Sequence, residues 1–163
     1  MKLVKSFDVD APPEQVGQVL CSEAFNVAAE RDRDEVLDAR HVLLEERGGD
    51  LVFEVRSTEY KRKKTGGIDR SGTVESKIRN TYDARARTLS WVYEGAGSRW
   101  VSVTGIYRLT PTERGTHVIH DISIEVNIPL IGGRIAKMIS GEFDAATRRF
   151  ERLLRDQLRS SMT

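Results

Sequence analysis

One histidine interrupts an otherwise apolar strand pattern. Val118, Ile122, Ile124 and Val126 alternate with polar residues as one face of a strand does, and His120 occupies the same phase. An imidazole titrates near neutral pH, so inside a cavity it could orient a carbonyl or hydroxyl group or move a proton. The alternative is a histidine whose hydrogen bonds to neighbours or water serve the fold alone.

Three aromatic residues with polar atoms fall on the inner faces of predicted strands. They are Trp91, Tyr93 and Tyr107. Such side chains present an apolar ring and one hydrogen-bonding group, which suits an amphipathic ligand. Plain packing of a hydrophobic core accounts for the same residues equally simply, because aromatic residues commonly dominate cores.

A run of four cations stands between two predicted strands, at Lys61, Arg62, Lys63 and Lys64. Each cation near an anionic bilayer contributes about 1 kcal/mol of attraction, so the run predicts a weak contact with anionic membranes. The alternative is a solvated polar loop, predicted here over residues 61–72, because blocks of like charge are commonly exposed.

The sequence lacks the motifs of several large enzyme classes. It contains no glycine-rich phosphate loop, no His-Glu-x-x-His, no Cys-x-x-Cys and no Gly-x-Ser-x-Gly. Its single cysteine, Cys21, has no adjacent histidine and lies on a predicted amphipathic helix, which argues against a nucleophile. We therefore assign no catalytic residue, no metal ligand and no cofactor.

Length and charge narrow the remaining classes of protein function. The 163 residues fit one domain spanning 1–163, and 26 basic against 25 acidic residues give a formal charge of +1. A nearly neutral chain is a poor candidate for a nucleic-acid binder. Residues 1–8 contain no continuous apolar run, and no window resembles a membrane span. The expectation is a soluble cytoplasmic domain.

A long helix must position these residues. From Pro129 to Leu158 the apolar residues recur in steps of three and four, the period of one helical face. Arg148, Arg152 and Arg155 lie on the opposite face. Such a helix needs a large apolar partner, because its stability comes mainly from packing. Asn127 is a possible N-terminal cap.

The rest of the chain predicts that partner. A first strand over residues 3–9 is followed by two short helices, with Asp10 or Ala11 capping the first and Ser22 the second. Six strands then follow as a meander, which pairs antiparallel. Each strand has one apolar and one charged face, as expected for a sheet covered on one side. The sequence predicts an α+β fold in which a curved sheet grips the long helix.

This order resembles the helix-grip arrangement of the START-like superfamily, which includes polyketide cyclases and birch-pollen-allergen-like proteins. The segments Val101–Pro111, Gly115–Thr116 and Ile124–Gly133, which ends in Pro-Leu-Ile-Gly-Gly, resemble a bacterial subfamily of unknown function. The resemblance covers essentially the whole chain. It implies a curved antiparallel seven-stranded sheet wrapped on the C-terminal helix. It also implies a ligand class, since members commonly hold lipids, sterols, polyketides or other apolar molecules between sheet and helix.

Combining the resemblance with the inner phases of the strands predicts a ligand cavity. Its lining would be Phe53, Val55, Trp91, Tyr93, Val101, Val103, Tyr107, His120, Ile122, Ile124, Ile135, Ile139 and Phe143. The leading hypothesis is a non-enzymatic domain that binds or carries a small hydrophobic or amphipathic ligand. A cyclase, aromatase or dehydratase using the same cavity is the first alternative, and a protein-interaction module is the second.

Overall fold

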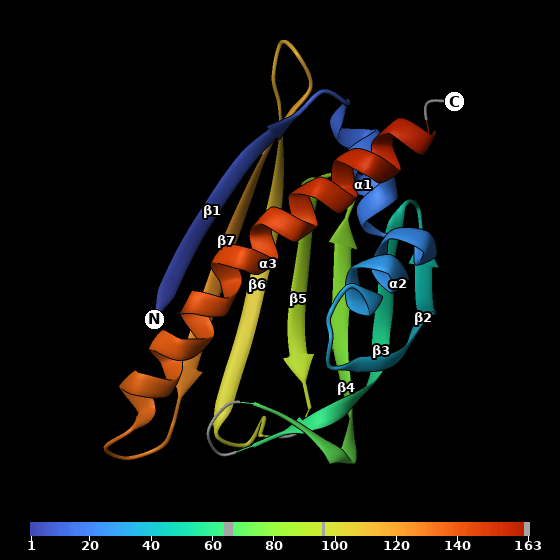
Figure 1. Ribbon diagram of the computed structural model, residues 1–163. Helices are drawn as coiled ribbons and strands as arrows, with labels where there is room; N and C mark the ends of the chain where they lie inside the picture. Colours follow the sequence, from blue (N-terminus) through green and yellow to red (C-terminus); the bar gives the residue numbers. More distant parts are fainter. Residues whose placement is uncertain (64–66, 96, 162–163) are drawn as a thin grey trace.

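The computed structural model describes residues 1–63, 67–95 and 97–161. Within them, seven strands form one antiparallel sheet and three helices lie on its concave face (Figure 1). The predicted α+β helix-grip fold is confirmed: one strand, two short helices, six further strands and one long helix follow in that order.

The sheet has the order β1-β7-β6-β5-β4-β3-β2, so all neighbours except β1 and β7 are consecutive in the chain. The strand bounds are β1 Lys2–Val9, β2 Val36–Arg47, β3 Asp50–Arg62, β4 Ile68–Asp83, β5 Thr88–Glu94, β6 Val101–Pro111 and β7 Thr116–Val126. β1 and β2 are the two edges. β2 pairs with β3 through two register shifts, at Val36/Asp38 and Leu43/Glu45, each a bulge or irregularity that bends the strand.

The two short helices cover one end of the sheet. α1, Pro13–Leu20, begins with Pro12 at the cap position rather than the predicted Asp10 or Ala11. Pro13 occupies the first helical position, which suits proline because its fixed φ is already helical and it has no N–H to satisfy. α2, Glu23–Arg31, is capped by Ser22, whose hydroxyl accepts a hydrogen bond from the Phe25 amide, as predicted.

The long helix α3, Gly132–Ser161, crosses the concave face diagonally (Figure 1). It starts three residues later than predicted, so Asn127 is not its cap. A three-residue turn precedes it, in which the Ile131 amide donates to the Pro129 carbonyl at 2.9 Å and Leu130 has a φ of 69°. None of the described helices has the length and hydropathy that a membrane span requires.

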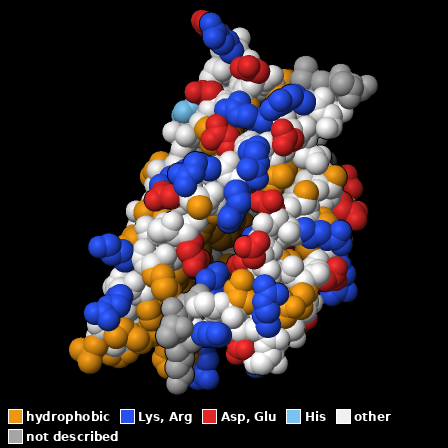
Figure 2. Space-filling view, in the orientation of Figure 1, with side chains coloured by type: hydrophobic (Ala, Val, Ile, Leu, Met, Phe, Trp, Pro, Cys, Tyr) orange, Lys and Arg blue, Asp and Glu red, His pale blue; other side chains and the backbone are white. Residues whose placement is uncertain are grey.

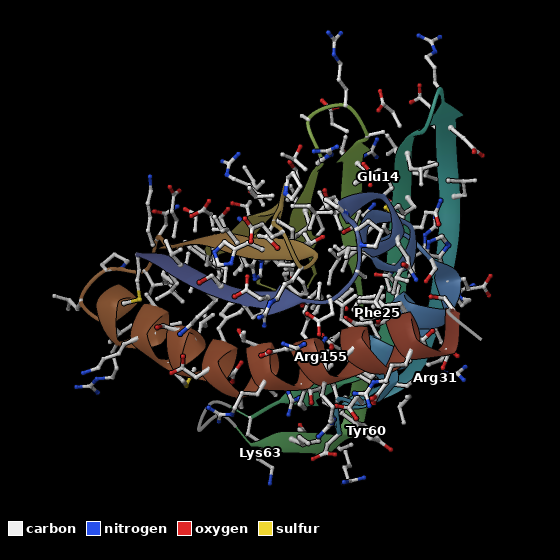
Figure 3. The ribbon with its side chains drawn as sticks, turned by 90° about the horizontal axis from the view of Figure 1, so that it is seen from above. Glu14, Phe25, Arg31, Tyr60, Lys63 and Arg155 are labelled. Atoms are coloured by element: carbon white, nitrogen blue, oxygen red, sulfur yellow. The ribbon has the colours of Figure 1, made fainter. Side chains whose placement is uncertain are left out.

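The predicted loop over residues 61–72 is largely strand. β3 continues to Arg62 and β4 begins at Ile68, so only a short connection separates them. The polar composition of this region suggested a loop, yet cross-strand hydrogen bonding accommodates polar side chains that face water. Seen from above, the hairpin carrying Tyr60 and Lys63 curls forward past α3 (Figure 3). The sheet therefore wraps the helix, as predicted.

The apolar interior divides into two clusters. The upper cluster joins α1, α2 and the C-terminal half of α3 to the sheet, with Val16, Phe25 and Leu154 among its most buried members. The lower cluster joins β5, β6 and β7 to the N-terminal half of α3, where Ala136 is the buried helical residue. Tyr107 contacts both clusters.

Candidate functional site

An aromatic row crosses the concave face where the two clusters meet. It consists of Trp91, His120, Tyr107 and Phe150. The Trp91 Nε1–H donates to His120 Nε2 at 2.9 Å, deep in the interior. The His120 ring stacks on Tyr107 at 3.8 Å between centroids, and Tyr107 stacks on Phe150 of α3 at 5.0 Å. The row therefore links β5, β7 and β6 to the long helix.

Strand register explains how the row forms. Tyr107 is the cross-strand partner of His120, so their side chains leave the same face of the sheet side by side. Gly105 is the partner of Trp91, and a Cβ atom built on Gly105 would come within 2.5 Å of the Trp91 ring. Glycine therefore lets the indole lie flat across β6 and reach His120 on β7.

The His120 imidazole is held neutral. Burial lowers the pKa of His120 to about 3, because a charged ring would lose its hydration. Since Nε2 accepts the hydrogen bond from Trp91, the neutral ring carries its proton on Nδ1 and presents a donor there. This histidine is accordingly a weak base at neutral pH.

The Tyr107 hydroxyl has no hydrogen-bond partner among the described residues. Burial raises the pKa of Tyr107, so the group stays protonated and can both donate and accept. No fully enclosed side-chain nitrogen or oxygen of the described chain lacks a partner. The Tyr107 oxygen must therefore border space that a water molecule can reach.

A buried polar cluster lies on the concave face beyond this row. Arg33 forms ion pairs with Glu30 at 2.9 Å and with Glu59 at 3.0 Å. Ser57 donates to Glu30 at 3.0 Å, and the Tyr93 hydroxyl donates to Glu59 at 3.3 Å. The two glutamates are only 9% and 7% exposed, and such charges are retained inside proteins only when paired in this way.

Electrostatics fix the protonation of this cluster. Burial disfavours the Arg33 charge, but the carboxylates of Glu30, Glu35 and Glu59 raise the pKa of the guanidinium. Burial and the nearby Glu59 carboxylate raise the pKa of Tyr93, so its hydroxyl remains a donor. The cluster is a closed set of satisfied partners and offers no free acid or base.

Two ion-pair crossings connect α3 to the opposite side of the molecule. Arg62 of β3 contacts Glu142 of α3 at 2.9 Å and Glu35 at 3.1 Å, and Arg149 of α3 contacts Asp32 at 3.6 Å. Glu142 and Arg149 lie two helical turns apart, roughly 10 Å. Figure 2 shows a hollow beside α3 with charged side chains of both signs around it and apolar side chains within it.

The thirteen predicted lining residues all lie on the concave side, but not in one cluster. Nine belong to or pack against the lower cluster: Trp91, Tyr93, Val101, Val103, Tyr107, Ile122, Ile124, Ile139 and Phe143. His120 joins them through its bond to Trp91. Phe53 and Val55 instead belong to the upper cluster, and Ile135 is half-buried on the first turn of α3.

Three participants were missed by sequence reasoning. Glu59 continues the alternation of Phe53 and Val55 along β3, and this phase is the one sequence signal that could have placed it inside. Arg33 follows the end of α2, where no periodic pattern predicts direction. Phe150 belongs to the apolar face of the predicted helix, but a period fixes a face and not a contact partner.

Three other features are separate from the row. An open groove of about 950 Å³ lies between α2 and β2, and none of the thirteen residues lines it. The Cys21 thiol is buried, and burial raises its pKa to about 12, so the nucleophilic thiolate does not form at neutral pH. In the basic run, Lys61 and Lys63 are exposed, Arg62 is ion-paired, and Lys64 lies outside the described residues.

One family model matches nearly the whole chain. Residues 5–158 match the family model described as "Protein of unknown function (DUF2505)". No curated protein matches the chain at the sequence level.

Solved structures with the same arrangement are similar over nearly their whole length. The protein TTHA0849 from Thermus thermophilus has a TM-score of 0.68 at 15% identity, with all of both chains covered. The Zhui aromatase/cyclase from Streptomyces sp. R1128 has a TM-score of 0.63 at 14% identity, covering 100% of this chain and 96% of that one. A START superfamily protein from Mycobacterium smegmatis has a TM-score of 0.61 at 14% identity, with 99% of each chain covered. These likenesses confirm the START-like fold predicted from the sequence.

Proposed function

This chain belongs to the DUF2505 family of proteins of unknown function, and we propose that it binds a small apolar or amphipathic molecule between the concave face of the sheet and α3. The thirteen predicted residues, with Phe150 added, would line the site. Similarity to an aromatase/cyclase and to a START superfamily protein supports this ligand class by analogy of fold.

The observation that carries the proposal is the Tyr107 hydroxyl. It has no partner in the described chain and borders space that water can reach, so a ligand oxygen can take the place of that water. The Nδ1–H of His120 is a second donor in the same stacked pair. A ligand with an apolar body and an acceptor oxygen would satisfy both groups.

The ligand would enter between the two ion-pair crossings of α3. Glu142, Ala145, Ala146 and Arg149 lie on one face of α3. Between the two ion-paired residues, this face therefore carries only the small alanine side chains. The hollow has apolar side chains within it and charged side chains around it (Figure 2). These surroundings fit an amphipathic molecule whose apolar part enters first and whose polar group stays near the charged rim.

Binding is favoured over the cyclase-type alternative by the state of the polar groups. His120 is neutral, is hydrogen-bonded to Trp91 and has a pKa of about 3, so it is a poor general base near neutral pH. The Arg33 cluster is closed on itself by its ion pairs. The arrangement orients a ligand more readily than it transfers a proton.

A titration with anilinonaphthalene-sulfonate tests the proposal. We expect saturable one-to-one binding that weakens when Val103→Trp fills the space and when Tyr107→Phe removes only the hydroxyl. Val92→Trp is the matched control, because Val92 is 43% exposed and alternates with the inward-facing Trp91 and Tyr93. Absence of binding, or equal loss from Val92→Trp in a folded protein, would reject the site. Native mass spectrometry of freshly purified protein would reveal a co-purified molecule.

A further inference from the structure

An apolar tip protrudes from one end of the molecule. We define it as Leu130, Ile131, Met138 and Trp100. Leu130 is fully exposed, and the other three are 47%, 51% and 50% exposed. A hydrogen bond from the Asn127 amide to the Trp100 carbonyl, at 2.7 Å, holds the β5–β6 connection beside the β7–α3 turn. Figure 2 shows apolar side chains gathered at this end.

The backbone at the tip is strained in a way that the fold does not explain. Leu130 sits at the apex of the three-residue turn closed by Ile131 and Pro129, with a φ of 69°. Glycine adopts a positive φ readily, whereas this turn is strained for a leucine. Its side chain gains nothing from burial within the chain, since it is fully exposed. Strain that no internal packing offsets points to a partner outside the chain.

The charges around the tip identify the kind of partner. From Val126 to Gly141 the chain has no carboxylate, and its charged residues are Arg134 and Lys137. The first turn of α3 has no acidic residue, although acidic residues are favoured at that position of a helix. Arg99 lies over the Trp100 ring at 5.5 Å. Among the described residues, none of these three cations has an ion-pair partner.

Other cations lie at the same end. The β3–β4, β5–β6 and β7–α3 connections all project from the lower end in Figure 1. Lys61 and Lys63 of the β3–β4 hairpin are exposed there. Lys61 and Lys63 share the field of the Asp69 carboxylate, whereas Arg99, Arg134 and Lys137 have no ion-pair partner among the described residues. A protruding apolar apex with such cations beside it matches a bilayer, which accepts leucine, methionine and tryptophan at its interface and attracts lysine and arginine through anionic headgroups.

We propose that this end docks on anionic membranes, with Leu130 and Ile131 entering the interface and Arg134, Lys137, Arg99 and the hairpin lysines contacting phosphate groups. Docking is independent of the proposed ligand, since the apolar tip is exposed in the empty protein. The two proposals can therefore fail separately.

The two tryptophans make the test specific. Trp91 is buried against His120, whereas Trp100 is at the tip, so insertion should shift only the Trp100 emission to the blue. We expect co-sedimentation and a blue shift with vesicles of phosphatidylcholine mixed with phosphatidylserine, and little of either with phosphatidylcholine alone. Added salt should weaken both. Trp100→Phe should abolish the shift.

Matched variants separate insertion from stability. Leu130→Gly removes the apolar side chain and suits the positive φ, so it should leave the unfolding midpoint unchanged or higher while reducing vesicle affinity about tenfold. Leu44→Asn on β2, where Leu44 is 44% exposed, should have no effect on vesicle affinity. Arg134→Gln and Lys137→Gln should each reduce affinity for anionic vesicles about fivefold.

Three results would overturn the proposal. One is the absence of a Trp100 shift in the presence of anionic vesicles. Another is an equal loss of vesicle affinity from Leu44→Asn. The third is a Leu130-dependent dimer in sedimentation experiments without vesicles, which would assign the tip to a second copy of the chain.

Discussion

At the scale of single residues, the bond between Trp91 and His120 decides what the site can do. Trp91 occupies Nε2, and burial keeps the ring uncharged. A residue that the sequence suggested as a proton carrier thereby becomes an uncharged hydrogen-bonding group. The stacked Tyr107 ring prevents it from swinging away without breaking the aromatic row.

The depressed pKa of His120 predicts a dependence of stability on pH. The folded-state pKa of about 3 is below the ordinary value of 6.5, so below pH 6.5 the unfolded chain takes up a proton that the folded chain refuses. Stability should be unaffected by this group above that pH and should fall by about 1.4 kcal/mol per pH unit between there and the folded pKa.

Urea unfolding at neutral pH and at about pH 5 measures this loss. His120→Gln keeps an acceptor for Trp91 but cannot titrate, so its stability should fall less on acidification than that of the wild type. Equal losses in the two proteins would show that His120 does not hold this depressed pKa.

At the scale of elements, the two halves of α3 are buried to different extents against the rest of the molecule. Its C-terminal half buries Leu154 and Leu158, whereas its N-terminal half buries only Ala136 among the described residues. Phe150, near the start of the C-terminal half, contacts rings from three other elements: Tyr107 at 5.0 Å, Phe25 at 5.2 Å and Phe7 at 6.3 Å.

Phe150→Ala should therefore destabilise the protein by roughly 3–5 kcal/mol, the range for loss of a packed aromatic ring. The measurement is the midpoint and slope of denaturant unfolding. Met138→Ala is the control on the same helix, because Met138 is 51% exposed and surface changes usually stay within about 0.5 kcal/mol. A midpoint for Phe150→Ala equal to that of the control would show that α3 does not pack through this ring.

Much of this arrangement could be predicted from the sequence because period and phase are local properties. The alternation in β7 and the three-and-four spacing in α3 each specify a buried face. The ion pair between Arg33 and Glu59 could not be predicted, because a contact between segments far apart in the chain leaves no periodic signal. The extra length of the β3–β4 hairpin was missed because polar residues on a solvent-facing strand resemble a loop.

At the scale of the whole molecule, the two clusters divide stability between two ends. The upper end combines α1, α2 and the better-buried half of α3, the lower end holds the apolar tip, and the aromatic row lies where the two clusters meet (Figure 1). Regions with fewer buried apolar contacts open locally before the rest of a protein unfolds. Movement of the lower half of α3 would widen the hollow without unfolding the upper end.

Hydrogen exchange followed by mass spectrometry should resolve this division. Amides of residues 133–145 should exchange well before those of residues 150–158, although both stretches belong to one continuous helix. Bound anilinonaphthalene-sulfonate should slow exchange in the first stretch more than in the second. Uniform protection along α3 would contradict the division.

The two edge strands of the sheet limit strand pairing between copies of the chain. An open sheet offers unpaired backbone groups that another strand could extend, the usual beginning of aggregation. On β2 the two register shifts leave the run from Asp38 to Leu43 as the longest regular stretch of edge. On β1, Lys5 turns inward and pairs with Asp144 of α3, so an incoming strand would have to accommodate an inward-pointing charge. Deleting the extra residue at either irregularity of β2 would restore a longer regular edge, and we expect such a chain to remain folded yet be lost to intermolecular strand pairing.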